Sequence, residues 1–295
     1  HPDVHRIDSI NCIEAKCASN EMEVLSMSGS DLNVFETLDY RVKEGIALIT
    51  LNREARHNAI NAQMSLELPQ LWQGFKKDPK AIVAIITGAG ERAFCTGADI
   101  ADLPQINMSS SEEARTSMGW TPLQNDVWKP VICAVNGMTI GGGLHFIADS
   151  DIVLAGETAT FSDTHVNVGL VSGLEPVALS RRMPLQAVLR MALVGGKDRM
   201  NAERALQCGL VGEVVKSEAL IERAFELAEL IKANSPAAMA RTKKAIWAAK
   251  DHSLEQALDL AWQQIIAHNS CADFEEGGRA FMEKRRPQWQ AYQPE

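Results

Sequence analysis

The stretch that most constrains the fold lies at residues 131–146 and reads VICAVNGMTIGGGLHF. Its apolar start predicts a buried strand, and three consecutive glycines, Gly141, Gly142 and Gly143, predict the beginning of a helix. Backbone N–H groups at a helix N-terminus carry partial positive charge and have no partner within the helix. Glycine also lets another molecule approach the backbone closely. The stretch therefore indicates either a site for negative charge or tight packing between helix and strand.

The first half of the chain alternates strand patterns with helical ones. Apolar runs predict a hairpin at 38–42 and 46–51, and strands at 82–87, 151–154 and 160–161. Helices are predicted over 61–77, where Asn61 is the N-cap, and over 109–128. A second glycine loop, FCTGADI, occupies residues 94–100. Strand pairs followed by helices indicate an α/β (α+β) protein built from repeated ββα units.

After Glu175 every predicted element is a helix. We expect three parts: an N-terminal extension at 1–33 that is disordered, a ββα core at 34–234, and a helical C-terminal subdomain at 235–295. Two apolar stripes at helical spacing are interpreted as core or helix–helix contacts. They comprise Leu220, Ala224, Leu227 and Ile231, and Leu254, Leu258, Trp262 and Ile265.

Composition excludes several classes of protein. A net charge of −9 opposes binding to nucleic acid or to anionic membranes, both of which favour a positive surface. No apolar run approaches the roughly 18 residues of a membrane span, and the polar first thirty residues do not resemble a signal peptide. Six cysteines lack metal-site or redox spacing, so we expect reduced thiols and a cytoplasmic location. Cys12 and Cys17 carry no motif.

Several segments together resemble the crotonase (enoyl-CoA hydratase/isomerase) superfamily, in the order found in that family. They are LNREARHNAI at 51–60, IITGAGERAFCTGADI at 85–100, KPVICAVNGMTIGGGLHF at 129–146, ADSDIVLAGETATFSD at 148–163, NSPAAMARTKKAI at 234–246 and DFEEGGRAFMEKRRPQW at 273–289. The resemblance covers about residues 36–290. It implies a crotonase-like spiral of ββα units and a helical C-terminal region that mediates trimer formation, commonly as a dimer of trimers.

The resemblance also implies an acyl-CoA substrate and an oxyanion hole. The two donors would be the backbone N–H groups of Ala98 and Gly142, because these positions match the family's two glycine loops. Two donors aimed at the thioester oxygen stabilise the enolate or oxyanion that forms. No cofactor or metal beyond coenzyme A itself is expected. The residues expected to bind coenzyme A are Arg53, Arg56, Arg92, Ala98, Asp99, Ile100 and Lys284.

The chain departs from the family at both acid/base positions. Hydratases of this family use two glutamates, whereas this sequence has His145 and His165 there. Imidazole titrates near neutrality, so two histidines can still act as acid and base. Asp163 lies two residues before His165, and in an extended segment the two side chains would share a face. Asp163 is therefore a third candidate, which could orient His165.

Other polar residues near these motifs are interpreted as structural. Asp151 and Glu175 are more easily explained as cap or structural residues, and Cys95 as a packing residue. Gly173 replaces the aspartate that dienoyl-CoA isomerases use, which disfavours that reaction. The acyl pocket is expected to include side chains from one helical segment. These are Met108, Met118, Trp120 and Leu123.

Three functions remain open at this stage. The first is an acyl-CoA enzyme of the enoyl-CoA hydratase type, with histidines in the acid/base positions. The second is a hydrolase that cleaves a carbon–carbon bond in a β-diketone or a cyclic β-keto thioester, where histidine would activate water. A related branch with that chemistry has lost the glycine triplet, which this chain retains. The third is a catalytically silent family member.

Overall fold

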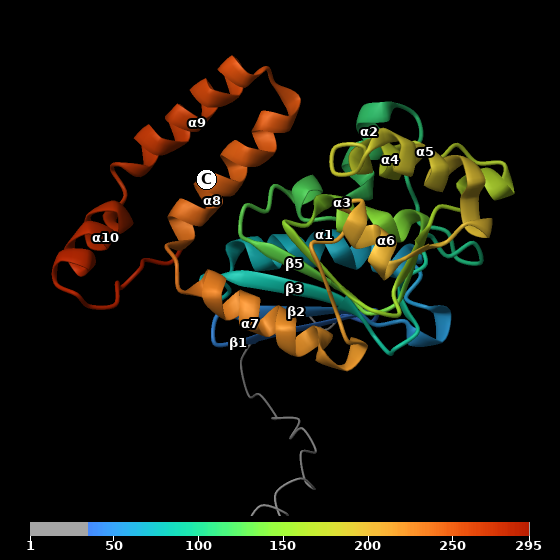
Figure 1. Ribbon diagram of the computed structural model, residues 1–295, viewed down its shortest axis with the longest axis horizontal. Helices are drawn as coiled ribbons and strands as arrows, with labels where there is room; N and C mark the ends of the chain where they lie inside the picture. The colour runs from blue at the N-terminus through green and yellow to red at the C-terminus, as the bar shows by residue number, and fades with distance from the viewer. Residues whose placement is uncertain (1–34, 295) are drawn as a thin grey trace, which may run out of the picture. The chain divides into compact units, whose positions relative to one another are not determined.

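The structure, a computed structural model, describes residues 35–294 (Figure 1). The expected N-terminal extension at 1–33 lies outside the described residues, as do Cys12 and Cys17. A six-stranded sheet has the order β1-β2-β3-β5-β7-β10. Its strands are β1 (Leu38–Lys43), β2 (Ile46–Leu51), β3 (Val83–Gly88), β5 (Val131–Val135), β7 (Ile152–Gly156) and β10 (Glu213–Val215).

The predicted hairpin is confirmed, because β1 and β2 pair antiparallel with Lys43 opposite Ile46. All the other pairs in this sheet are parallel. Every residue of β3 and of β5 is buried, as expected for central parallel strands covered on both faces. A smaller sheet has the order β4-β6-β8-β9. Its strands are β4 (Ala93–Cys95), β6 (Met138–Ile140), β8 (Thr160–Ser162) and β9 (Met200–Asn201).

The two sheets are built by a repeated ββα unit, as the sequence predicts. Each of three successive turns places one strand in the large sheet and the next in the small sheet, and a helix follows. The turns are β3-β4-α2, β5-β6-α3 and β7-β8-α4, with α2 at Ser111–Met118, α3 at Leu144–Asp149 and α4 at Leu174–Leu179. Because the turns are stacked, the loops after β4, β6 and β8 come from neighbouring strands of one sheet.

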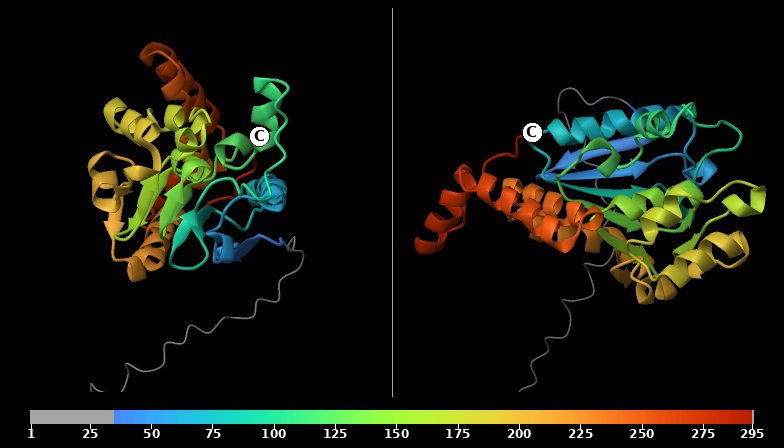
Figure 2. Two further views of the ribbon diagram at one scale, coloured as in Figure 1. Left: turned by 90° about the vertical axis from the view of Figure 1, so that its right-hand side faces the viewer. Right: turned by 90° about the horizontal axis from the view of Figure 1, so that it is seen from above.

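Helices cover both faces of the large sheet. Along β3, Ala84 and Ile86 face the cluster that contains α1 (Ala62–Lys77), while Val83 and Ile85 face the cluster that contains α7 (Leu220–Lys232). Figure 2 shows α1 and α7 on opposite sides of the sheet. The first apolar stripe therefore packs on the sheet, as expected. Asn61 caps α1 by accepting a hydrogen bond of 3.0 Å from the Met64 backbone N–H.

The helix predicted over 109–128 is shorter in the structure. Helix α2 ends at Met118 because Gly119 adopts a left-handed backbone with φ 52°, and only a 3-10 turn follows at Leu123–Asn125. After Glu175, where only helices are predicted, β9 and β10 are strands, because these short stretches pair with β8 and β7 at the edges of the two sheets. The remaining elements of this part are helices. They are α5 (Leu185–Val194), α6 (Ala202–Gln207), α8 (Pro236–Ala248), α9 (Leu254–His268) and α10 (Ala272–Met282).

The second apolar stripe differs from its expectation. Leu254 and Trp262 on α9 are 77% and 60% exposed, so this stripe is uncovered within one chain.

Helix α8 is attached to the core through Lys243, whose ammonium lies 2.8 Å from the Asp151 carboxylate and donates to the Lys129 carbonyl. Among residues 35–294 no helix has the length and apolarity required to cross a membrane.

Candidate active site

The two glycine loops touch one another. Gly97 has φ +82°, and a Cβ atom added to it would lie 2.9 Å from the backbone nitrogen of Gly142. A Cβ atom added to Gly142 would lie 3.6 Å from the nitrogen of Ala98 and 3.3 Å from the Gly97 Cα. Only glycine allows the backbones to approach this closely. The structure thus brings together the two residues that the sequence predicts as oxyanion donors.

Backbone hydrogen bonding fixes the direction of the Ala98 N–H. Ile60 donates to the Gly97 carbonyl and accepts from the Asp99 N–H, both at 2.8 Å, in a parallel bridge. Ala98 lies between Gly97 and Asp99, so its own N–H points away from Ile60. Gly142 belongs to the 3-10 turn at Gly141–Gly143 that leads directly into α3, and the first N–H groups of such a helix have no internal acceptor. The Ala98 N–H is therefore not used in the bridge to Ile60, and the Gly142 N–H is not used within its helical turn.

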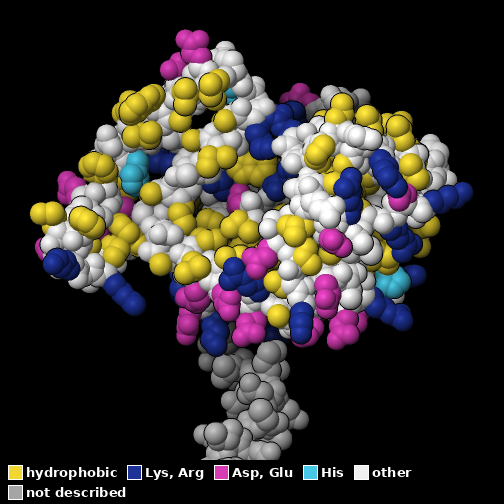
Figure 3. Space-filling model, in the orientation of Figure 1, with side chains coloured by type: hydrophobic (Ala, Val, Ile, Leu, Met, Phe, Trp, Pro, Cys, Tyr) yellow, Lys and Arg dark blue, Asp and Glu magenta, His cyan; other side chains and the backbone are white. Residues whose placement is uncertain are grey.

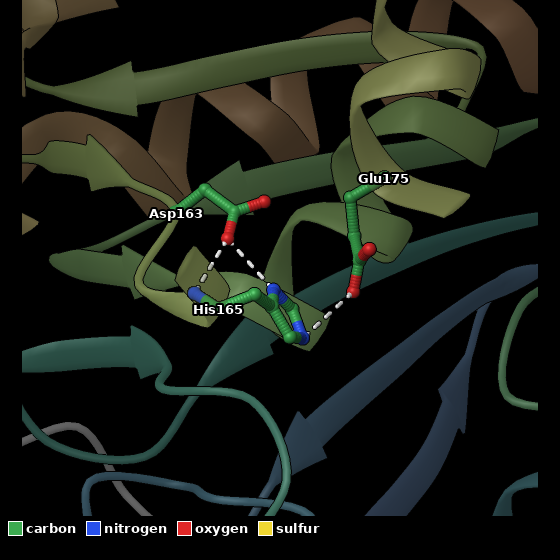
Figure 4. Close-up of side chains that lie close together, drawn as sticks. All are labelled: Asp163, His165 and Glu175. Atoms are coloured by element: carbon green, nitrogen blue, oxygen red, sulfur yellow. Dashed lines mark hydrogen bonds and ion pairs between the residues drawn. The ribbon is translucent and has the colours of Figure 1, made fainter. Parts of the chain in front are cut away.

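Asp163 holds His165 in a fixed orientation (Figure 4). The Nδ1 atom of His165 lies 2.7 Å from Oδ1 of Asp163, which also accepts the His165 backbone N–H at 3.0 Å. Ser172 donates its hydroxyl to the other carboxylate oxygen at 2.5 Å. The Asp163 side chain is 1% exposed and that of His165 is 26% exposed. Asp163 thus contacts His165, although His165 begins a 3-10 turn and the segment is not extended as the sequence predicts. The Nε2 atom of His165 is left facing Glu175.

Glu175 corrects one prediction, because it lies between the two histidines and is not merely a cap of α4. Its Oε1 atom is 3.2 Å from Nε2 of His145 and 3.8 Å from Nε2 of His165. Figure 4 shows its side chain directed toward His165. The side chains of Glu175 and His145 are both nearly buried. Glu175 thus brings a carboxylate from the first turn of α4 to both histidines.

The pKa values of Glu175, Asp163 and His165 shift in the directions that favour their charged forms. Burial raises the pKa of Glu175, but the hydrogen bond and charge of His145 outweigh it, so the net pKa is lowered. Burial likewise opposes ionisation of Asp163, whose pKa is lowered overall by the hydrogen bonds from His165 and Ser172. The hydrogen bond to Asp163 raises the pKa of His165 above 6.5, against the effect of burial. The site thus holds two ionised carboxylates beside two imidazoles.

Trp120 forms a wall of this site. Its ring meets the His145 ring edge-on with centroids 6.0 Å apart, and its Cζ3 atom lies 3.3 Å from where a Gly142 Cβ would be. The indole N–H donates to the Ser65 hydroxyl, which fixes the ring. Of the other expected pocket residues, Met118 is buried, Leu123 is half-buried and Met108 is 80% exposed. Of these residues only Met118 lies on α2, and the structure buries Met118 and Trp120 but leaves Met108, which precedes the helix, exposed.

The residues expected to bind coenzyme A fall into three groups. Arg53 and Asp99 bind each other, with Nη2 and Oδ2 3.0 Å apart, and Arg53 also donates to the Ala59 carbonyl. The exposed residues Arg56, Arg92, Ala98 and Ile100 lie on the loops around the glycine contact. Lys284 follows α10, and Figures 1 and 2 show α10 well separated from α3 and α4. Their roles toward coenzyme A stay predictions.

Asp163, His165 and Glu175 could also hold a metal ion, since their ligand atoms lie within 4.8 Å of one another. Each of them has a partner within the chain, however: Asp163 pairs with His165 and Ser172, and Glu175 with His145. The donor set therefore suits either a divalent ion or proton transfer.

The thiols of Cys95, Cys133 and Cys208 are buried and form no disulfide bonds. Cys95 packs against Gly143, as expected for a packing residue.

Comparison with known proteins identifies the family of this chain. The family model for enoyl-CoA hydratase/isomerase matches residues 41–292. The chain is 34% identical over 251 residues to the (E)-benzylidenesuccinyl-CoA hydratase of Thauera aromatica, covering 83% of this chain and 96% of that protein. It is 36% identical over 252 residues to the mevalonyl-coenzyme A hydratase of Aspergillus fumigatus, covering 83% and 91%.

A solved structure shows the same fold. The crystal structure of an enoyl-CoA hydratase/isomerase from Mycobacterium paratuberculosis superimposes with a TM-score of 0.82 at 38% identity, covering 88% of this chain and all of that one. The resemblance noted in the sequence is confirmed by these matches. The chain belongs to the enoyl-CoA hydratase/isomerase family, within the crotonase superfamily.

Proposed function

We propose that this protein is an acyl-CoA hydratase whose acid and base are His165, His145 and Glu175. The observation that carries the proposal is the convergence of both histidines on the Glu175 carboxylate. An addition of water to an enoyl thioester needs a base for the water, an acid for the α-carbon and a stabilised enolate oxygen. The glycine contact between Gly97 and Gly142 supports the third requirement.

In the proposed reaction the thioester oxygen accepts hydrogen bonds from the N–H groups of Ala98 and Gly142. His165, oriented by Asp163, takes a proton from water through Nε2 while the oxygen attacks the β-carbon. The double-bond electrons move onto the thioester oxygen as an enolate, which the two N–H groups stabilise. A proton shared by His145 and Glu175 then goes to the α-carbon, and the proton taken up by His165 returns to that pair through Glu175, which restores the site. Dehydration follows the same steps in reverse.

The relatives support a thioester substrate in which water is added or removed. Those compared above are named as hydratases of benzylidenesuccinyl-CoA and mevalonyl-coenzyme A. The proposed chemistry uses only groups of this chain, so we propose that it requires no metal and no cofactor beyond coenzyme A in the substrate. A cytoplasmic location stays a prediction.

We also propose that copies of the chain associate as trimers, or as dimers of trimers, through the C-terminal helices. Figure 3 shows hydrophobic side chains exposed along the helices at the C-terminal end. On α9 and α10 the exposed apolar residues include Leu254, Trp262, Ile266, Phe281 and Met282. A stripe of this size on a soluble protein favours burial against another surface. Sedimentation of the full chain tests this, because a monomer at working concentrations would contradict it.

Binding and turnover of one unsaturated thioester test the proposed activity. Calorimetric titration with butyryl-CoA is expected to show saturable binding, and crotonyl-CoA is expected to gain a hydroxyl at the β-carbon. Dialysis against a chelator should leave this turnover unchanged, since the acid and base are side chains. A folded protein that neither binds acyl-CoA nor hydrates any enoyl-CoA would contradict the proposal. That result would instead support a catalytically silent family member.

A carbon–carbon hydrolase is the second candidate. The observation in its favour is the Asp163–His165 pair, since an imidazole oriented by a carboxylate is suited to activating water. The intact glycine contact favours a thioester over a free diketone even for this reaction. Assays of diketone cleavage and of crotonyl-CoA hydration with the single variants His145→Ala and His165→Ala separate the two functions.

A further inference from the structure

A cavity of about 280 Å³ lies against α5. Its lining comes from α5, from the segment that joins α5 to α6, and from the first turn of α6. None of these residues is among those expected to bind acyl-CoA. Figure 3 shows Lys and Arg side chains exposed on the right-hand side of the molecule, where Figure 1 places α5 and α6. Ligand pockets usually have volumes of roughly 300–1,000 Å³, so this cavity suits a small molecule.

The lining of this cavity is strongly basic. It contains three arginines, Arg190, Arg199 and Arg204, and a single carboxylate, Asp198. Three positive charges and one negative charge leave an excess of two positive charges, on a chain whose net charge is −9. Like charges repel one another, so an anion between these side chains would be attracted by several of them at once.

Asp198 is committed to Arg190. The Nε atom of Arg190 lies 2.5 Å from Oδ2 of Asp198, and its Nη2 atom lies 3.3 Å from Oδ1. The hydrogen bond from Arg190 lowers the pKa of Asp198, so this carboxylate is ionised at neutral pH. It neutralises one guanidinium and leaves the charges of the other two uncompensated.

The contacts of Arg199 and Arg204 are with neutral groups. The Nη1 atom of Arg199 lies 3.7 Å from the sulfur of Met138, which is a weak acceptor. Nη1 of Arg204 donates to the amide oxygen of Gln207 at 3.2 Å. Among residues 35–294 neither guanidinium has a carboxylate partner. Each keeps several N–H donors in a planar fork, a geometry that matches two oxygens of a phosphate.

Apolar side chains line the rest of the cavity. Met191 on α5 is 4% exposed, and Ala187 and Met200 are half-buried. A bare inorganic ion would leave this surface unused, whereas a molecule with an anionic head and an apolar body would bury both parts. We propose that the cavity binds a small phosphomonoester, with its phosphate between Arg199 and Arg204 and its organic part against Met191 and Met200. This site does not depend on the proposed hydratase activity.

Calorimetric titration of the full chain with phenyl phosphate tests the inference, because this probe joins a phosphomonoester to an apolar ring. We expect saturable binding of one molecule per chain with a Kd below about 1 mM. Inorganic phosphate lacks the ring and benzoate lacks the second charge, so both should bind about fivefold more weakly. Phenyl phosphate gains its second charge near pH 6, roughly, whereas arginine stays charged, so its affinity should rise as the pH is raised through that value.

Substitution of the two arginines locates the binding. Arg199→Gln and Arg204→Gln should each raise the Kd for phenyl phosphate about fivefold, and the double variant about 25-fold if the two act independently. The matched control is Arg223→Gln on α7, which removes a partly exposed arginine that pairs with Glu213. It should leave the Kd unchanged. Circular dichroism establishes that each variant is folded.

Coenzyme A carries a phosphomonoester of its own, so butyryl-CoA is titrated into the same variants. Its Kd should be unchanged in the double variant. A parallel loss for both ligands would overturn the inference, because the two arginines would then belong to the coenzyme A site. Absence of saturable binding of phenyl phosphate up to about 10 mM would also overturn it. Binding that the double variant does not weaken would do the same. These outcomes are read without any turnover of crotonyl-CoA, so they are distinct from failure of the hydratase proposal.

Discussion

The Nε2 atom of His145 lies 3.2 Å from Oε1 of Glu175, although α3 and α4 place these residues thirty positions apart in the chain. Both side chains are nearly buried, and an isolated charge at such a place would be costly. The imidazole compensates for the burial and lowers the pKa of the carboxyl group. Glu175 therefore remains ionised where it can exchange a proton with His145, and it also lies near His165.

The pH dependence of hydration should reflect His165. A base must be neutral to accept a proton, and the hydrogen bond to Asp163 raises the pKa of His165 above 6.5. The rate constant kcat/KM should therefore fall as pH drops through a value above 6.5. Asp163→Asn removes the interaction that raises this pKa, so the acid limb should move to lower pH. Asp251→Asn on the surface, where Asp251 pairs with Arg181, is the matched control. An acid limb unmoved by Asp163→Asn would contradict the assignment.

A methyl group at Gly142 should obstruct the oxyanion site. In Gly142→Ala the added Cβ would lie 3.6 Å from the Ala98 nitrogen and 3.3 Å from the Trp120 ring. Hydration of crotonyl-CoA should fall about 10²- to 10³-fold, the effect of losing one oxyanion donor. Gly74→Ala in α1 is the control, because its Cβ would meet nothing within 4 Å. It should keep full activity and raise the free energy of unfolding by about 0.5–1 kcal/mol. Equal activities in the two variants would contradict the proposed donor.

Arg53 and Arg56 should have different effects although both were expected to bind coenzyme A. Arg53 is paired with Asp99 and is largely buried, so Arg53→Ala leaves a buried carboxylate without its ion-pair partner. The free energy of unfolding of the Arg53→Ala variant should be lower by about 1–3 kcal/mol. Arg56 is exposed, and Arg56→Ala should raise KM for acyl-CoA about fivefold, the loss of roughly 1 kcal/mol from one exposed ion pair, without loss of stability. Thermal unfolding and steady-state kinetics distinguish the two, and the reverse pattern would refute this division.

The sequence predicts most of the fold because its periodicities are local. The apolar strand at Val131–Val135 and the Asn61 cap of α1 depend only on neighbouring residues, and both are found where predicted. The end of α2 at Gly119 was missed, because apolar residues continue beyond a glycine whose φ of 52° stops the helix. The exposed stripe on α9 has the same pattern as a buried one, since periodicity does not specify the partner.

The site was predicted in part for a related reason. Asp163 and His165 are two positions apart, so their contact could be expected from spacing. Glu175 offers no such signal, because its approach to His145 depends on how α4 packs against α3. The available hint was an acidic residue between Leu174 and Pro176, at the start of a mostly apolar helix. Such a residue is buried with a partner or is at a helix cap, and the sequence does not distinguish these.

The most direct test of the account is the rate of crotonyl-CoA hydration by Glu175→Gln, which keeps the shape of the side chain and removes its charge and its ability to accept a proton. Glu229→Gln, which alters an exposed pair with Lys232 on α7, is the matched control. We predict that kcat/KM falls about 10²- to 10⁴-fold in Glu175→Gln and is unchanged in the control, with both variants folded. Full hydratase activity in a folded Glu175→Gln protein would contradict the central claim.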